Sequence, residues 1–251
     1  MIVVTGAKGY IGSVLMNKLP EAVGTDIDAW DIRTPQQPDP NVKVVVHLAA
    51  LVRVGESVEK AQDYYDTNVT GTLNVIRAFP NAKFIFASTG AAFNPDSPYG
   101  HSKVMSEQII KDTCKNGYTI FRFYNVGGGI PTNPDGLPAS ITRARETGTF
   151  TIFGNDYPTK DGTCVRDYIH VDDITDALVR AVNEPAANTD YEPLGSGKSY
   201  TVEEYVNAYI NKHGQDFNVM YGDRRPGDLA ISEVPFVSKF MNVTKTLEDI
   251  V

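Results

Sequence analysis

Short runs of β-branched apolar residues alternate with amphipathic stretches through the first half of the chain. Strands are predicted at 2–5, 22–25, 42–48, 84–87 and 118–123, and helices at about 10–19, 64–79 and 98–115. The run at 42–48 is almost continuously apolar, which is typical of a parallel strand buried on both faces. This alternation predicts an α/β fold built on a doubly wound parallel sheet.

The pattern changes after about residue 126. Glycine and proline are frequent between 127 and 138, and the regular strand–helix rhythm is lost. Later helices are predicted at 172–183 and at 201–213, where Thr201 and Glu204 form a capping box. We therefore expect a first domain over 1–125, with a further sheet contribution near 165–185, and a small C-terminal lobe over 126–251.

Composition excludes several classes of function. The 251 residues carry a formal net charge of −8, which argues against a nucleic-acid partner. The only cysteines are Cys114 and Cys164, in no metal-binding or disulfide spacing, as expected in a reducing compartment. No charged leader segment and no apolar run of about 20 residues is present. The sequence thus predicts a cytoplasmic protein with no membrane partner and no metal.

A glycine motif follows the first predicted strand. Gly6, Gly9 and Gly12 have the spacing of a turn that brings backbone close to a pyrophosphate at a helix N-terminus. Asp26 ends the next apolar run, where a carboxylate can accept both ribose hydroxyls and would repel a 2′-phosphate. The glycine spacing is weak by itself, but together these residues predict a Rossmann-type domain that binds NAD rather than NADP.

A second motif places Tyr99 and Lys103 one helical turn apart. A lysine ammonium near a tyrosine hydroxyl lowers the phenol pKa from its usual value of about 10, so Tyr99 could act as a general acid and base. Ser88 and Thr89 end the strand before this helix, where ligands bind in open α/β sheets. The Tyr-Lys pair alone would be a chance match in many chains.

Several stretches together resemble the extended short-chain dehydrogenase/reductase superfamily, and within it the UDP-glucose 4-epimerases. These are TGAKGYIGS (5–13), HLAA (47–50), VGESVEKAQDYYDTNVTGTLNVI (54–76), SPYGHSK (97–103), FRFYNVGG (121–128), FGNDYPTKDGTCVRDYIHVDDI (153–174) and RRPGDLA (224–230). The 153–174 block is more similar to the epimerases than to the superfamily at large.

The resemblance implies an NAD-dependent 4-epimerase of UDP-hexoses that acts through a transient 4-keto sugar. It implies a catalytic base at Tyr99, its partner at Lys103 and a sugar-binding hydroxyl at Thr89. The implied cofactor-binding residues are Gly6, Gly9, Tyr10, Ile11, Gly12, Asp26, Asp31, Ile32, Leu48, Ala49, Ala50, Asn68, Ser88, Tyr99, Lys103 and Tyr124. The implied substrate-binding residues are Thr89, Tyr99, Asn125, Phe153, Arg166, Arg225, Asp228 and Ser232.

Within this resemblance, Arg166 and Arg225 would clamp the diphosphate and Asp228 would bind the uridine ribose. Ser232 stands where the family limits space around the hexose, and its small side chain predicts activity on UDP-GlcNAc and UDP-GalNAc as well. The resemblance also implies a homodimer, formed by the helices after Tyr64 and after Pro98.

The sequence also departs from the family. Only five positions separate Asp26 from Asp31, where the family has a crossover helix, so this helix is predicted to be missing and the sheet to be reduced. Gly90 and Ala91 follow Thr89 where 4,6-dehydratases need two carboxylates, which argues against dehydration. A UDP-glucuronate 4-epimerase or decarboxylase and a non-catalytic NAD-binding regulator remain alternative functions.

Overall fold

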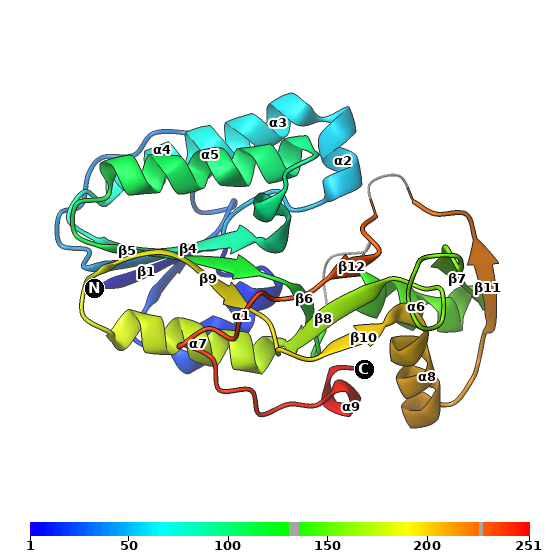
Figure 1. The fold of residues 1–251 in the computed structure, drawn as a ribbon. Helices are drawn as coiled ribbons and strands as arrows, with labels where there is room; N and C mark the ends of the chain where they lie inside the picture. The colour runs from blue at the N-terminus through cyan, green and yellow to red at the C-terminus, as the bar shows by residue number, and fades with distance from the viewer. Residues whose placement is uncertain (131–135, 226–227) are drawn as a thin grey trace. The chain divides into compact units, whose positions relative to one another are not determined.

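The computed structural model describes residues 1–130, 136–225 and 228–251 (Figure 1). The chain forms two compact units. Unit 1 comprises Met1–Phe123 and Thr175–Pro193, and unit 2 comprises Tyr124–Ile174 and Leu194–Val251. The chain therefore enters unit 2 after the fifth strand and returns to unit 1 for a helix and one more strand.

Unit 1 is built on a six-stranded sheet in the order β2-β1-β3-β4-β5-β9. The strands are β1 (Ile2–Thr5), β2 (Val23–Thr25), β3 (Val44–His47), β4 (Lys83–Thr89), β5 (Tyr118–Phe123) and β9 (Asn188–Leu194). β1 pairs in parallel with both β2 and β3, and the parallel register continues from β3 to β4 and β5. The strand order reverses at β1, so the predicted doubly wound sheet is confirmed.

Helices lie on both faces of this sheet (Figure 1). One side carries α2 (Val54–Glu59), α3 (Ala61–Tyr65), the π-helix η1 (Asp66–Thr70), α4 (Gly71–Ala78) and α5 (Pro98–Thr113); the other carries α1 (Tyr10–Lys18) and α7 (Val171–Asn183). A short 3₁₀ turn, η2 (Gly90–Phe93), follows β4. The single helix predicted at 64–79 is thus three contiguous segments, because one turn near Asn68 widens to the π form.

The crossover from β2 to β3 contains no helix in residues 26–43, as predicted. Trp30 and Ile32 fill the space instead, each 6% exposed. The Trp30 ring meets Phe79 edge-on with ring centres 6.0 Å apart. The closest Ile32 carbon would be only 2.7 Å from a Cβ at Gly71, so the helix packs directly on this segment. Two large apolar side chains therefore seal the core where a helix is missing.

The later sheet contribution lies elsewhere than expected. The sixth strand of unit 1 is β9 at Asn188–Leu194, whereas β8 (Val165–His170) belongs to a separate sheet in unit 2. The predicted contribution near 165–185 was wrong because α7 occupies most of that range. Periodicity alone does not tell which of two sheets a short apolar run will join.

Unit 2 consists of two small sheets with helices beside them. β8 pairs with β6 (Asn125–Gly127), β10 (Ser199–Thr201) and β12 (Ile231–Ser232), and β7 (Thr149–Phe153) pairs with β11 (Asn218–Gly222). The helices are α6 (Leu137–Thr147), α8 (Val202–His213) and α9 (Leu247–Ile250). The predicted capping box at the start of α8 is confirmed, with Glu204 N donating to Thr201 Oγ1 at 3.0 Å and Thr201 N donating to Glu204 Oε2 at 2.9 Å.

Candidate functional site

The glycine loop connects β1 to α1 and accepts only glycine at two positions. Gly6 has φ +71°, and a Cβ there would lie 2.7 Å from the backbone nitrogen of Ala49. A Cβ at Gly12 would lie 2.0 Å from the Gly6 carbonyl oxygen. Helix α1 begins at Tyr10 with no acidic residue in its first turn. Its N–H groups and dipole therefore favour an anion, and the loop fits a dinucleotide pyrophosphate.

The loop and the neighbouring strand ends form one continuous surface of unit 1. Leu48 follows β3, and its N–H donates to the Thr5 carbonyl at 3.1 Å. The predicted cofactor residues that the structure brings together here are Gly6, Gly9, Tyr10, Ile11, Gly12, Asp26, Leu48, Ala49 and Ala50.

Asp26 lies at the end of β2, beside the glycine loop. Its Oδ2 accepts from the backbone N–H of Lys8 at 2.8 Å, and its Oδ1 accepts from the N–H of Ile27 at 2.8 Å. The carboxylate is thereby held against the loop that would carry the pyrophosphate. This position suits the predicted ribose contact, since the adenosine ribose is adjacent to that pyrophosphate.

Asp31 and Ile32 have different environments from one another. Asp31 forms a bidentate ion pair with Arg33, with Nη2 2.6 Å from Oδ2, and this hydrogen bonding lowers the pKa of the Asp31 carboxyl. The Ile32 side chain is buried in the unit 1 core, and its carbonyl accepts from Asn74 Nδ2 at 2.9 Å. Their predicted contact with adenine stays a prediction, and the visible role of Ile32 is to anchor the crossover.

Asn68 ties two predicted cofactor segments to each other. Its side-chain amide exchanges hydrogen bonds with the backbone of Leu51, at 2.9 and 3.0 Å, just after Ala50. Its Nδ2 also donates to Ser102 Oγ on α5 at 2.9 Å. Asn68 is 2% exposed and lies in the π-helix, a distortion that is often found at functional sites. Its role in this structure is to fix the loop after β3 against α5.

Tyr99 lies in the first turn of α5, after the Ser97 N-cap, whose hydroxyl accepts from Gly100 N at 3.2 Å. Its side chain is nearly buried, with the ring edge-on to Tyr64 at a centre distance of 6.3 Å. Burial raises the pKa of the Tyr99 phenol, and a hydrogen bond with the Thr89 hydroxyl opposes this rise. The structure thus brings the two predicted sugar-facing hydroxyls together.

Lys103 is buried one turn further along α5, with Nζ 4.3 Å from the centre of the Phe86 ring. Burial lowers the pKa of its ammonium to about 7, and the charge of Glu107 opposes the shift. The predicted lowering of the Tyr99 pKa by Lys103 is not what this structure has. Burial dominates at Tyr99, and the lysine ammonium rests on an aromatic face.

A buried cluster around Glu107 of α5 was not predicted from the sequence, and it includes Ser88 of β4 and Arg122 of β5. Ser88, predicted to face the cofactor, donates from Oγ to Glu107 Oε1 at 2.5 Å. Glu107 is also paired with Arg122, at 2.9 Å and 2.6 Å. The available signal was spacing, because Glu107 follows Lys103 by four residues and so lies on the same helix face.

In unit 2, the predicted substrate residues Arg166, Asp228 and Ser232 lie together. The register of β8 and β12 places Ser232 opposite Arg166. Arg166 Nη1 donates to the Leu229 carbonyl at 2.7 Å, and Nη2 lies 3.4 Å from Asp228 Oδ1. One guanidinium therefore connects β8 to the segment that carries both other residues.

The remaining predicted residues of unit 2 also have partners. The Arg225 guanidinium lies 3.9 Å from the centre of the Phe153 ring. Asn125 Nδ2 donates to the Asp167 carbonyl at 3.0 Å, and the backbone N–H of Tyr124 donates to the Leu194 carbonyl at 3.1 Å. A guanidinium over an aromatic ring suits a pocket for a flat, anionic nucleotide.

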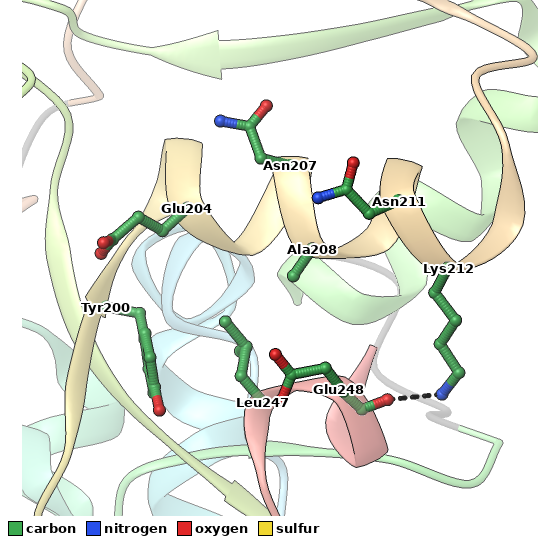
Figure 2. A pocket seen from close by; sticks show the side chains of 8 residues that line it. All are labelled: Tyr200, Glu204, Asn207, Ala208, Asn211, Lys212, Leu247 and Glu248. Atoms are coloured by element: carbon green, nitrogen blue, oxygen red, sulfur yellow. Dashed lines mark hydrogen bonds between the residues drawn. The ribbon is translucent and has the colours of Figure 1, made fainter.

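An open groove of about 560 Å³ lies elsewhere in unit 2, between α8 and α9 (Figure 2). Tyr200, Asn207, Asn211 and Leu247 are among its lining residues. Lys212 Nζ closes one end by donating to the carbonyls of Glu248 and Val251, at 2.6 and 2.7 Å. None of the predicted site residues lines this groove.

The described parts of the chain lack a metal-binding cluster and a membrane-spanning helix. Within residues 1–130, 136–225 and 228–251, no group of three or more His, Cys, Asp or Glu side chains is placed to hold a metal ion. None of the helices in these ranges has the length and apolar character that crossing a bilayer requires.

The sequence matches the model of the NAD dependent epimerase/dehydratase family over residues 2–195. The UDP-glucose 4-epimerase of Bacillus subtilis (strain 168) is 32% identical over 294 residues, which cover 91% of this chain and 87% of the relative. That matched span is longer than the whole 251-residue chain. The relative therefore contains segments that this chain lacks, in agreement with the helix-free crossover.

Solved structures of the same kind superpose over nearly the whole chain. The UDP-glucose 4-epimerase of Bifidobacterium longum, in complex with NAD+ and UDP, has a TM-score of 0.84 at 26% identity and covers 99% of this chain and 95% of its own. The UDP-Glc/GlcNAc 4-epimerase of Campylobacter jejuni has a TM-score of 0.77 at 27% identity, with coverages of 99% and 96%.

Proposed function

Because the chain belongs to the NAD-dependent epimerase/dehydratase family, we propose that it is a 4-epimerase that interconverts UDP-glucose and UDP-galactose. The observation that carries the proposal is the meeting of Tyr99 and Thr89 in the unit that also holds the glycine loop. Dinucleotide binding alone fits many reactions, but a buried tyrosine paired with a threonine hydroxyl adds a group that can move a proton.

NAD would be held in unit 1 by the glycine loop and Asp26. Bound there, it supplies reversible hydride transfer with C4 of the hexose. Tyr99 would take the proton of the 4-hydroxyl while the 4-keto sugar forms, and return it when the opposite epimer forms. The Thr89 hydroxyl would hold the same oxygen. Burial favours the neutral phenol, so the lysine ammonium on the same helix face must help to stabilise the phenolate during turnover.

The UDP part would bind to unit 2. Arg166 is now tied to Asp228, and Arg225 covers Phe153. A diphosphate offers both guanidiniums stronger charge-assisted partners, and the ribose hydroxyls offer donors to the Asp228 carboxylate. The Phe153 ring would then be free to stack on uracil. Firm binding of UDP with a loosely held hexose would let the 4-keto sugar rotate, so that its opposite face meets the cofactor before it is reduced.

We also propose activity on the N-acetylated substrates UDP-GlcNAc and UDP-GalNAc. Ser232 is small and only partly buried, and it lies opposite Arg166 in the strand register. A Ser232→Tyr variant should keep conversion of UDP-galactose and lose most conversion of UDP-GalNAc. Full N-acetyl activity in this variant would remove Ser232 from the specificity argument.

We propose a homodimer and a cytoplasmic location as well. Exposed apolar side chains gather on α2 and α5, where Val54, Val58 and Met105 are 48%, 67% and 49% exposed. Such a face favours burial against a second copy. Cys114 and Cys164 are free thiols, which suits a reducing compartment. Sedimentation at micromolar concentration tests the dimer.

The test of the main proposal compares wild type with Tyr99→Phe in the conversion of UDP-galactose to UDP-glucose. We expect Tyr99→Phe to lose activity by about 100-fold or more, since general acid–base catalysis contributes on that order. Tyr118→Phe is the matched control. Tyr118 is the first residue of β5, and its hydroxyl donates to Asp190 at 2.9 Å rather than to a predicted site residue. No turnover of any UDP-hexose by NAD-loaded wild type would instead favour the non-catalytic NAD-binding alternative.

A further inference from the structure

A buried ion pair lies below the catalytic face of α5. Arg122 on β5 donates from Nε to Glu107 Oε1 at 2.9 Å and from Nη2 to Oε2 at 2.6 Å. The Glu107 side chain is 4% exposed and the Arg122 side chain 11%. Such a pair adds little net stability, because removing two charges from water offsets their attraction. Because net stability does not explain the pair, its place beside the proposed catalytic residues indicates a role in the site.

The pair connects three parts of the proposed catalytic site. Glu107 lies one turn after Lys103 on the same face of α5. Its Oε1 accepts from Ser88 Oγ at 2.5 Å, which fixes the end of β4 directly before Thr89. The Arg122 guanidinium contacts the rings of both Phe93 and Tyr191, at 4.5 and 4.7 Å from their centres.

These contacts restrain the backbone on both sides of Thr89. Ser88 is held from the strand side, and Phe93 closes the 3₁₀ turn that follows. The Thr89 hydroxyl itself accepts from Ala91 N at 3.2 Å within that turn. A hydroxyl that must meet both Tyr99 and a sugar oxygen needs such fixed surroundings, because small misplacements cost large factors in rate.

The charge of Glu107 also acts on Lys103. Other groups near this ammonium include the Phe86 ring on β4 and His47 on β3, and Tyr99 lies one turn earlier on α5. His47 is neutral near pH 7 because burial and the Lys103 charge lower its pKa to about 3. Burial lowers the pKa of Lys103 to about 7, and Glu107 is the group that opposes this shift. Removing the carboxylate would lower the ammonium fraction at every pH near and above neutrality.

We propose that Glu107 is a positioning residue of the epimerase: held by Arg122, it fixes the Ser88–Thr89 strand end and keeps a negative charge one turn from Lys103. This rests on the proposed function, because it assigns Lys103 and Thr89 to catalysis. In this proposal Glu107 makes no direct contact with substrate or cofactor, because its two carboxylate oxygens are bonded to Ser88 and Arg122.

The test compares wild type with Glu107→Gln and Glu107→Asp over pH 6–9.5, measuring kcat and KM for UDP-galactose. Glu107→Gln keeps the shape and loses the charge. We expect its kcat to fall about tenfold at pH 8.5, with KM within about twofold of wild type. The alkaline limb of the pH profile of kcat should move to lower pH by about one unit. Glu107→Asp should restore the position of that limb while kcat stays low, because the shorter side chain does not reach Ser88.

Glu21→Gln is the matched control, since Glu21 is an exposed glutamate of the same unit. Ser88→Ala serves if Glu107→Gln does not fold, and should lower kcat several-fold without moving the limb. Wild-type kinetics in Glu107→Gln, or in Ser88→Ala if only that variant folds, would overturn the positioning role. The Lys103 titration, followed by ¹³C NMR of lysine-labelled protein with Lys103→Met for assignment, reads the charge effect without turnover. If the protein converts no UDP-hexose, but the Lys103 titration still shifts in Glu107→Gln, the proposed function fails while the electrostatic effect of Glu107 stands.

Discussion

Replacing Gly12 by alanine tests whether the glycine loop is the cofactor cradle. The new Cβ would lie 2.0 Å from the Gly6 carbonyl oxygen and 2.9 Å from Ala7 Cα, and both neighbours are backbone atoms that no rotamer change can remove. The start of α1 must therefore move away from the loop by about 1.5 Å to reach ordinary contact distance. Backbone hydrogen bonds to a pyrophosphate do not survive such a shift.

The loss in affinity follows from those hydrogen bonds. Each one to a charged acceptor is worth about 1.5–3 kcal/mol, so losing two costs about 3–6 kcal/mol. At about 1.4 kcal/mol for each factor of ten, the Kd for NAD should rise by more than about 100-fold. Overpacking of this kind also costs about 1–3 kcal/mol of stability, which leaves a folded protein for the binding assay.

The assay is the NAD content of the purified protein together with calorimetric titration of the stripped protein with NAD. Gly55→Ala is the control, because a Cβ at Gly55, in helix α2, meets nothing within 4 Å. It should bind NAD normally and be more stable by about 0.5–1 kcal/mol, the helix propensity difference between glycine and alanine. Normal NAD affinity in a folded Gly12→Ala protein would refute the assignment of the loop.

Two further predictions concern buried ionisable groups of unit 1. The folded-state pKa of His47 lies near 3, below the unfolded value near 6.5, so its contribution to stability is complete above about pH 6.5 and is lost as pH falls towards 3. In urea unfolding, this group should make the free energy of unfolding about 2 kcal/mol lower at pH 5 than at pH 8. His47→Asn should remove this pH dependence, and the control His101→Asn, at an exposed histidine, should keep it. Lys83 Nζ donates to the carbonyls of Ala181 and Glu184 at the end of α7, so Lys83→Met should lower the free energy of unfolding by about 2–3 kcal/mol without changing kcat. Thermal unfolding measures this effect, and an unchanged Tm relative to Lys115→Met would contradict it.

The inner strands of the unit 1 sheet were predictable because most of their residues are buried. The run at 42–48 is interrupted before His47 only by Lys43, and the structure makes its Val44–His47 part a central strand. The capping box at Thr201 was equally readable, because its hydrogen bonds are local. The π-turn at Asn68 was not, since nothing in the local sequence distinguishes it from an α-helix. Its side chain is satisfied by Leu51 and Ser102, which are distant along the chain.

In the candidate site, too, local features were predictable from the sequence and features that depend on the fold were not. Spacing placed Tyr99 and Lys103 on one helix face, but the sign of the Tyr99 pKa shift depends on burial, which spacing does not report. Glu107 was overlooked for a related reason. A glutamate on a helix usually faces water, and only the fold reveals that Arg122 and Ser88 meet it inside the protein.

The helix-free crossover shows how a chain can lose a whole element and keep its sheet. A crossover helix does two things: it returns the chain to the far side of β1, and it covers apolar surface beside the strands. Here residues 26–43 connect β2 to β3 without a helix. Trp30 and Ile32 cover the apolar surface instead, by packing on Phe79 and Gly71. The indole N–H is satisfied within the segment, donating to the Thr34 carbonyl at 2.9 Å. Two well-placed side chains thus replace the core contacts of a helix, while Asp26 keeps its position beside the glycine loop.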